Sequence, residues 1–293
     1  MRRLVAVGVA AVLLAGCGGQ AKKPPPTPTP IRIGTKNFTE QRILGELYRQ
    51  ALEQAGFRVA LKTDVGSTEI IHEAMRGGAL DMYPEYIGVL LSEVAGVANR
   101  PKDPERALDL ARDFERHNGF AILDASPFSD SNAIAVQTGH AEGQGLRTIG
   151  DLRHIPGASI AAPPEFRTRV EGLVGLKSDY GLRKLQVHAL PIGAQYAALD
   201  GGRVDAAAVF TTDGQLAQRH YRLLADPKRL FADQHVAPIV SAKLTRRYGA
   251  RLVDVINGVT ERLTVVAMRR MNADVDLHHQ TPAAVARAFL AGG

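Results

Sequence analysis

Short apolar segments alternate with amphipathic ones along the chain from Ile31 onward, and this alternation limits the folds open to it. Residues 39–55 carry apolar side chains at helical spacing, and Thr39 is a suitable N-cap for that helix. Such alternation predicts an α/β fold in which helices cover mainly parallel sheets. The strand candidates are 31–34, 57–63, 80–83, 133–137, 158–162, 185–189, 204–209 and 236–241.

The C-terminal part of the chain is predicted to be helical only. Apolar side chains recur at helical spacing through residues 251–270 and again through 282–290. Thr281 and Pro282 are residue types that cap and open a helix, so they are expected to start the last one.

Two segments of the chain repeat one another without a gap, AMRGGALDMYPEY (74–86) and ALDGGRVDAAAVF (198–210). Each reads as the end of a helix, a Gly-Gly stop, an aspartate and a strand. The repeat predicts two similar α/β lobes, with Tyr86 and Phe210 at matching places just past a strand. Because ligands of open α/β sheets lie beyond the carboxyl ends of strands, the two rings are expected to face each other across one cleft. A chance recurrence of Gly-Gly-x-x-Asp is the alternative.

The N-terminus reads as an export signal that ends in the one cysteine of the chain. Two arginines precede a short apolar run, and the string Leu-Ala-Gly leads to Cys17. This resembles the lipobox of bacterial lipoproteins, which predicts a signal peptide over 1–17 and a lipid on Cys17. Residues 18–30 are rich in proline and predict an extended linker. A secreted protein with an unpaired thiol, or a short transmembrane anchor, are the alternatives.

The chain carries no motif of a catalytic, metal or nucleic-acid site. It lacks a nucleophile elbow, a P-loop, HExxH and CxxC, so no catalytic residue and no cofactor is expected. His278 and His279 are adjacent and would point to different faces of a helix, so no metal is expected there. The net charge of +6 comes from dispersed basic residues, and no nucleic-acid partner is expected.

Basic residues lie at two predicted helix starts, where anions are favoured. The segment GTKNFTEQ (34–41) joins a strand to a helix and places Lys36 there. The segment PPEFRTRVEGL (163–173) does the same for Arg167 and Arg169 in the other lobe. A lysine and an arginine so placed would make a clamp for a carboxylate. The alternative is that these are ordinary surface charges.

Several segments together resemble the substrate-binding lipoproteins of ABC importers for osmoprotectants such as glycine betaine, choline and carnitine. They are IGTKNFTEQRILGELY, DMYPEYIGVLL, PPEFRTRVEGL, VFTTDGQL, LADPKRLFADQHVAPIV and the ending TPAAVARAFL. The resemblance implies a two-lobed, hinged periplasmic-binding-protein-like fold with the ligand in the cleft. It also implies that Lys36 and Arg169 hold a carboxylate and that Tyr86 and Phe210 form part of an aromatic box around a quaternary ammonium.

The chain departs from this family pattern at three positions. Asn132 and Gln234 stand where the family has aromatic residues, and Val89 replaces a threonine. Cation–π contacts contribute about 1–2 kcal/mol each when desolvated, so the two amides should weaken the binding of bare trimethylammonium groups. They favour instead a ligand with hydrogen-bonding groups.

These observations predict an exported, lipid-anchored solute-binding component of an ABC importer that works with permease and ATPase subunits. Its lobe one would comprise residues 31–130 and 237–293, and its lobe two residues 131–236. The ligand would be a betaine-type osmoprotectant bound by Lys36, Tyr86, Asn132, Arg169, Phe210 and Gln234. Another small carboxylated or amino solute, a ligand-sensing receptor and an exported enzyme on the same fold are the alternatives.

Overall fold

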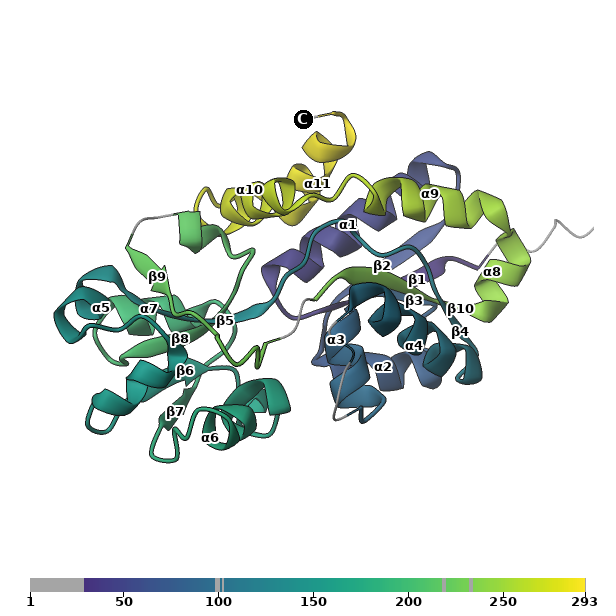
Figure 1. Cartoon of the computed structure of the whole chain (residues 1–293). Helices are drawn as coiled ribbons and strands as arrows, with labels where there is room; N and C mark the ends of the chain where they lie inside the picture. Colours follow the sequence, from purple (N-terminus) through teal and green to yellow (C-terminus); the bar gives the residue numbers. More distant parts are fainter. Residues whose placement is uncertain (1–28, 98–100, 102, 218–219, 232–233, 293) are drawn as a thin grey trace, which may run out of the picture.

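The computed structural model describes residues 29–97, 101, 103–217, 220–231 and 234–292. These residues form two five-stranded sheets, each covered by helices, which define a first and a second lobe (Figure 1). Cys17 and the predicted linker up to residue 28 lie outside the described residues. Of the helices described, none combines the length and apolar character needed to cross a bilayer.

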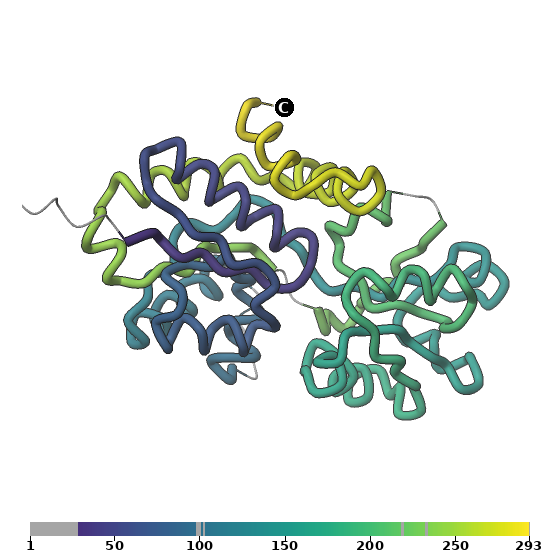
Figure 2. The backbone as a smooth tube through the Cα atoms, turned by 180° about the vertical axis from the view of Figure 1, so that it is seen from behind, coloured from purple at the N-terminus to yellow at the C-terminus, as the bar shows by residue number. Residues whose placement is uncertain are grey.

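The first lobe is built on a sheet with strand order β2-β1-β3-β10-β4. Its strands are β1 (Ile31–Lys36), β2 (Val59–Gly66), β3 (Met82–Tyr86), β4 (Phe120–Ile122) and β10 (Val236–Ser241). Its helices are α1 (Thr39–Gln54), α2 (Thr68–Arg76), α3 (Ile87–Val89), η1 (Leu90–Val94), α4 (Pro104–His117), α8 (Ala242–Tyr248), α9 (Ala250–Thr260), α10 (Val265–Asp276) and α11 (Pro282–Leu290). Seen from either side, the C-terminal helices lie along α1 (Figure 2).

The second lobe repeats this plan with strand order β7-β6-β8-β5-β9. Its strands are β5 (Asn132–Gln137), β6 (Ser159–Ala162), β7 (Gln186–Ala189), β8 (Ala206–Phe210) and β9 (Tyr221–Leu223). Its helices are α5 (Thr138–Gln144), η2 (Ile149–His154), η3 (Pro164–Arg167), η4 (Val170–Val174), α6 (Gly175–Ser178), α7 (Ala194–Asp200) and η5 (Gly214–Ala217).

Both sheets are mixed but mainly parallel, as predicted, because four of the five strands in each run in the same direction. In each sheet the first three strands are parallel, and the fourth, β10 or β5, runs antiparallel to its neighbours. These two strands follow the segments at which the chain passes from one lobe to the other (Figure 1). A short apolar segment encodes a strand but not its direction, which the crossing of the chain decides.

Each sheet is packed on both faces, because neighbouring residues of a strand point to opposite sides. In β3, Met82 packs under α1 and the C-terminal helices, whereas Tyr83 packs toward α2 and α4. In β5, Ile134 and Ala133 likewise belong to opposite clusters of the second lobe. The sequence pattern of short apolar strands follows from this burial on two sides.

Two predicted helix boundaries differ from the structure. Phe38, not Thr39, is the N-cap of α1, because the Thr39 hydroxyl instead donates to Asp276 Oδ1 of α10 at 2.6 Å. The predicted helix 251–270 is broken into α9 and α10, since the Thr264 side chain caps a new helix by accepting from Ala267 N. The start of α11 at Thr281 and Pro282 is confirmed by the same kind of cap.

The internal repeat is confirmed as a structural one. Helices α2 and α7 both end at a Gly-Gly pair whose second glycine has a left-handed φ, 69° at Gly78 and 63° at Gly202. The aspartate that follows then accepts a hydrogen bond from a backbone N–H of the neighbouring strand. Asp81 accepts from the N–H of Arg32 at 2.9 Å, and Asp205 accepts from that of Ser159 at 2.8 Å. The two lobes therefore present the ends of β3 and β8 in the same way.

Candidate binding site between the lobes

A pocket of about 770 Å³, which includes space open to solvent, lies between the two lobes. All six predicted site residues line it, so residues from distant parts of the chain are brought together as expected. The full lining is Lys36, Asn37, Phe38, Ser67, Thr68, Tyr86, Val89, Asp130, Asn132, Pro163, Glu165, Phe166, Arg169, Glu171, Ile192, Gln195, Ala208, Val209, Phe210 and Gln234. Within the described part of the chain, no cluster of three or more His, Cys, Asp or Glu side chains is arranged to hold a metal ion.

Tyr86 and Phe210 end β3 and β8, the matching strands of the two lobes. Each is held in register by the strand that enters its sheet after a lobe crossing: Tyr86 lies opposite Val236, and Phe210 lies opposite Asn132. Strands β10 and β5 therefore position both rings in the lining of the pocket.

A third ring, Phe38, stacks against both of these aromatic residues. Its centroid lies 6.1 Å from that of Tyr86 and 5.4 Å from that of Phe210, with interplanar angles of 27° and 20°. Phe38 is not among the residues predicted from the sequence, although it follows Lys36 and Asn37 in the strand-to-helix connection. The site thus has a stack of three rings with Phe38 between the two predicted ones, and this stack forms its apolar wall.

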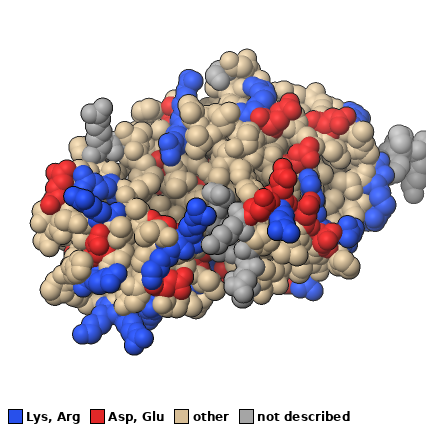
Figure 3. All heavy atoms as spheres, viewed as in Figure 1, with Lys and Arg blue, Asp and Glu red and all other residues tan. Residues whose placement is uncertain are grey.

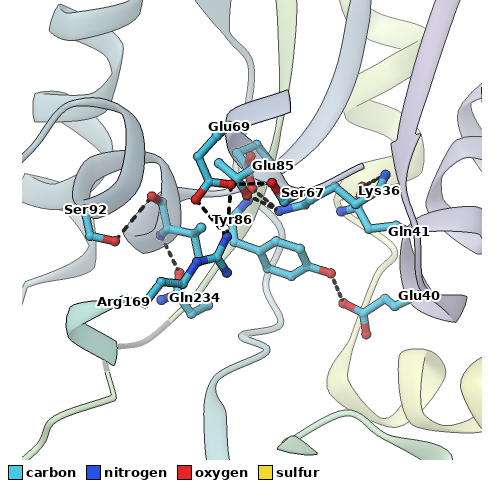
Figure 4. Close-up of polar contacts among 12 residues, drawn as sticks. Lys36, Glu40, Gln41, Ser67, Glu69, Glu85, Tyr86, Ser92, Arg169 and Gln234 are labelled. Atoms are coloured by element: carbon cyan, nitrogen blue, oxygen red, sulfur yellow. Dashed lines mark hydrogen bonds and ion pairs between the residues drawn. The ribbon is translucent and has the colours of Figure 1, made fainter. Parts of the chain in front are cut away.

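Lys36 lies at the end of β1, and its ammonium group is already paired. The Lys36 Nζ forms an ion pair with Glu85, donates to Thr68 Oγ1 at 2.9 Å and lies 4.5 Å from the centroid of the Tyr86 ring. Burial lowers the pKa of Lys36, and the Glu85 carboxylate opposes this shift. Figure 4 shows Lys36 pointing toward Glu85, next to the Tyr86 ring. The basic group that was predicted to clamp a carboxylate is thus part of a buried ion pair.

Arg169 of the second lobe reaches across to the first lobe. Its Nη2 lies 3.2 Å from both carboxylate oxygens of Glu69 in α2 (Figure 4). Its Nε lies 3.8 Å from Glu93 Oε2 in η1. Arg167, the other candidate in this segment, is exposed and donates to the carbonyl of Val187. Arg169 therefore lines the pocket and bridges the lobes, whereas Arg167 is bonded to strand β7 of the second lobe.

The two amides that depart from the family pattern both donate to one carboxylate. Asn132 Nδ2 and Gln234 Nε2 lie 2.9 Å and 3.0 Å from Glu171 Oε2, and Gln234 Oε1 accepts from the N–H of Val89 at 3.0 Å. Glu171 is 4% exposed and lines the pocket. Glu171 is not among the residues predicted from the sequence, although it stands two residues after Arg169 in the segment that carries the resemblance.

Buried carboxyl groups lie behind the aromatic stack and join the lobes. Tyr86 OH donates to Glu40 Oε1 at 2.7 Å (Figure 4), and Thr212 Oγ1 of the second lobe donates to Glu40 Oε2 at 2.5 Å. Asp130 accepts from the N–H of Thr212 at 3.1 Å. Burial raises the pKa of Glu40 and raises that of Asp130 well above its ordinary value.

Asp213 belongs to the same region and gives a prediction on pH. Burial raises the pKa of Asp213 to about 7, while its hydrogen bonds from Phe210 N and Tyr196 OH oppose the shift. The folded state then binds a proton that the unfolded state releases between about pH 4 and 7, so the free energy of unfolding falls as the pH rises through this window. The free energy of unfolding can fall by at most roughly 4 kcal/mol across this window. We expect about half of this loss, because Asp213 is partly exposed.

Urea unfolding of wild type and Asp213→Asn across this pH range measures the effect. Asp213→Asn should flatten the decline in stability between about pH 4 and 7. Asp200→Asn changes an exposed acid of the same lobe and serves as the control. Equal pH profiles for wild type and Asp213→Asn would contradict the assignment.

Two similar lobes with one pocket between them, lined by residues of both, define a solute-binding protein of the two-lobed type. The sequence profile of the family described as the substrate-binding domain of the ABC-type glycine betaine transport system matches residues 29–292. The chain belongs to this family, and it is a substrate-binding component of an ABC transport system. The family is one of extracytoplasmic binding proteins.

Individual relatives agree with this assignment. The chain is 31% identical over 272 residues to the glycine-betaine-binding protein of Pseudomonas aeruginosa, which covers 89% of this chain and 86% of that protein. It is 26% identical over 282 residues to the carnitine transport binding protein OpuCC of Listeria monocytogenes, covering 94% of this chain and 89% of that protein. A solved glycine betaine/carnitine/choline ABC transporter structure matches with a TM-score of 0.72 and 26% identity, over 89% of this chain and 98% of that one.

Proposed function

We propose that this chain binds a small betaine-type osmoprotectant, such as glycine betaine, choline or carnitine, and presents it to a membrane permease driven by an ATPase. The observation that carries the proposal is the pocket between the lobes, in which a stack of three aromatic rings lies beside the basic groups of Lys36 and Arg169. Aromatic faces attract methylated ammonium groups, and basic groups attract a carboxylate. The names of the relatives support the same class of ligand. The chain would act as a binder and not as an enzyme.

The lobes would close around the ligand by moving about the two crossing segments. These segments lie side by side, with Asp130 N donating to the carbonyl of Gln234 at 3.0 Å and Ser126 N donating to that of Val236 at 2.7 Å. We place lobe one at residues 31–130 and 237–293 and lobe two at 131–236, except that β10 already begins in the sheet of lobe one at Val236. Closure of such lobes presents the ligand-bound state to the permease.

In this proposal each side of the ligand has its own set of residues. Arg169, with Lys36 behind it, would hold the carboxylate, and Tyr86 and Phe210, bridged by Phe38, would contact the methylated ammonium. Asn132 and Gln234 would act on the polar side of the ligand through the carboxylate of Glu171, to which their amide groups donate.

A panel of ligands tests the proposed function. Thermal shift followed by calorimetric titration with glycine betaine, choline, carnitine, proline betaine, ectoine and amino acids should show binding by at least one methylated ammonium compound. Binding confined to ordinary amino acids would favour a protein for another carboxylated or amino solute. Transport of the bound compound by cells, lost when the gene is deleted, would separate an importer component from a ligand-sensing receptor.

Membrane attachment through Cys17 is a separate prediction. The apolar run followed by Leu-Ala-Gly-Cys predicts that the exported protein carries a lipid on Cys17 and stays in the membrane fraction. Cys17→Ser should release the protein into the soluble exported fraction or leave it unprocessed. If labelled fatty acid fails to enter the wild-type protein, the lipid anchor is disproved, while ligand binding would be unaffected.

A further inference from the structure

Glu40 lies behind the ring stack at the start of α1, and its carboxylate meets residues of three other segments. It is 3% exposed and stands in the first turn of the helix, where a negative charge is favoured. Tyr86 OH donates to its Oε1 at 2.7 Å (Figure 4). Thr212 Oγ1 and Asn272 Nδ2 donate to its Oε2 at 2.5 Å and 3.0 Å. One oxygen of Glu40 is thus bonded within the first lobe, and the other is bonded across the two lobes.

Thr212, the donor from the second lobe, is held at this point by all of its polar groups. Besides the hydroxyl bond to Glu40, its N–H donates to Asp130 Oδ1 at 3.1 Å, and its carbonyl accepts from Asn272 Nδ2 of α10 at 2.9 Å. The residue is 1% exposed. Since Glu40 and Asn272 belong to the first lobe, their bonds to Thr212 break when the lobes move apart at this place.

The same carboxylate is linked to all three rings of the stack. Phe38 is the N-cap of α1 and stands two residues before Glu40. Tyr86 carries the hydroxyl that donates to Glu40, and Phe210 precedes Thr212 by two residues at the end of β8. A buried hydroxyl left without a partner costs free energy, so the bond to Glu40 fixes where the Tyr86 ring lies. Glu40 therefore connects the position of the second lobe to that of a ring of the first.

We propose that Glu40 is a positioning residue that couples closure of the lobes to the placement of the Tyr86 ring in the ligand site. The inference rests on the proposed function, in which this ring contacts the methylated ammonium. Where the lobes meet, Thr212 holds one oxygen of the carboxylate, and the other oxygen holds the Tyr86 hydroxyl. Where they separate, the carboxylate loses the Thr212 bond, and the ring loses part of its support. Glu40 is not among the residues that line the pocket, so it acts through the ring and not on the ligand.

A double-mutant cycle on two hydroxyls of different lobes tests this coupling. Tyr86→Phe and Thr212→Val each remove one donor to Glu40 and nearly keep the size of the side chain. Each should weaken the binding of glycine betaine in calorimetric titration by about 3- to 20-fold. The double variant should bind at least about threefold more tightly than two independent losses predict, because both hydroxyls act through one carboxylate. If wild type binds choline or carnitine but not glycine betaine, the cycle uses that compound.

The same cycle in a Glu40→Gln background shows whether Glu40 carries the coupling. The amide of Gln offers one acceptor oxygen in place of two, so the departure from additivity should fall below about twofold. A merely structural role of Glu40 would lower stability without removing the coupling between Tyr86→Phe and Thr212→Val in binding.

Tyr48→Phe is the matched control. It removes the hydroxyl of another buried tyrosine of the first lobe, which is paired with Thr260 Oγ1 at 2.9 Å instead of with Glu40 and does not line the pocket. It should leave the affinity for glycine betaine unchanged, and its effect should be additive with that of Thr212→Val. Melting temperatures of all variants report whether they fold.

The outcomes separate this inference from the proposed function. Additive effects of Tyr86→Phe and Thr212→Val on affinity would overturn the inference and leave the proposed function standing. Coupling of unchanged size in the Glu40→Gln background would also overturn it, because the two hydroxyls would then be linked by another route. If no methylated ammonium compound binds the wild-type protein, the proposed function fails and the inference falls with it.

Discussion

Lys36→Met is expected to lower the free energy of unfolding by about 3–5 kcal/mol, the cost of removing one partner of a buried ion pair. Lys36 is 5% exposed and Glu85 is fully buried, so the substitution leaves the Glu85 carboxylate without its cation in the interior. The hydrogen bond that Glu85 accepts from the N–H of Tyr86 at 2.7 Å remains and does not replace that charge. Urea unfolding at neutral pH measures the loss.

A double-mutant cycle tests whether the pair is the cause. Lys36→Met with Glu85→Gln removes both charges and should recover most of the stability lost by either single change. Lys62→Met is the matched control, because Lys62 is an exposed lysine of the neighbouring strand β2, and it should change stability by less than about 0.5 kcal/mol. Additive single changes would show that Lys36 and Glu85 do not act as a pair.

Site residues could be predicted from the sequence where a local sequence pattern marked their position. The repeat located Tyr86 and Phe210, because a helix, a Gly-Gly stop and an aspartate before a strand have the same geometry in both lobes. The two basic candidates of different lobes, Lys36 and Arg169, stood out because each lies at a strand-to-helix or turn connection.

The partners of these residues could not be predicted in the same way. Glu69 is distant in sequence from Arg169, and only the packing of the two lobes brings them to 3.2 Å. The stacking of Phe38 between two rings likewise depends on the tertiary structure, since nothing in the neighbouring sequence distinguishes Phe38 from a core residue. Local sequence encodes which element a residue belongs to, whereas the charge balance of the pocket is decided by which elements meet.

Charged side chains of both signs lie on the surface of the two lobes. On the face seen in Figure 3, basic and acidic side chains are interspersed over both lobes. On this face the basic residues form no continuous path for a polyanion. We therefore expect single substitutions of the charges that line the pocket to have the clearest effect on binding.

Arg169→Ala is expected to weaken ligand binding by roughly 1.5–3 kcal/mol, or about 10- to 150-fold, which is the range for a charge-assisted hydrogen bond. The same change should alter the free energy of unfolding by less than about 1 kcal/mol, because the Arg169 side chain is 20% exposed and its ion pairs are partly screened. Arg167→Ala, an exposed neighbour of equal charge, should leave the affinity unchanged. Calorimetric titration and urea unfolding of both variants measure the two effects, and equal affinity of Arg169→Ala and wild type would remove Arg169 from the site.

Glu69→Gln then separates the two ways in which Arg169 can act. If the ion pair with Glu69 helps to hold the lobes together, as the contacts of Arg169 Nη2 with both carboxylate oxygens favour, this substitution should weaken ligand binding. The expected loss is about twofold to fivefold, since a partly exposed pair contributes up to roughly 1 kcal/mol. If Glu69 instead competes with a ligand carboxylate for Arg169, the same substitution would strengthen binding. The sign of the change therefore decides whether Arg169 serves closure as well as the ligand.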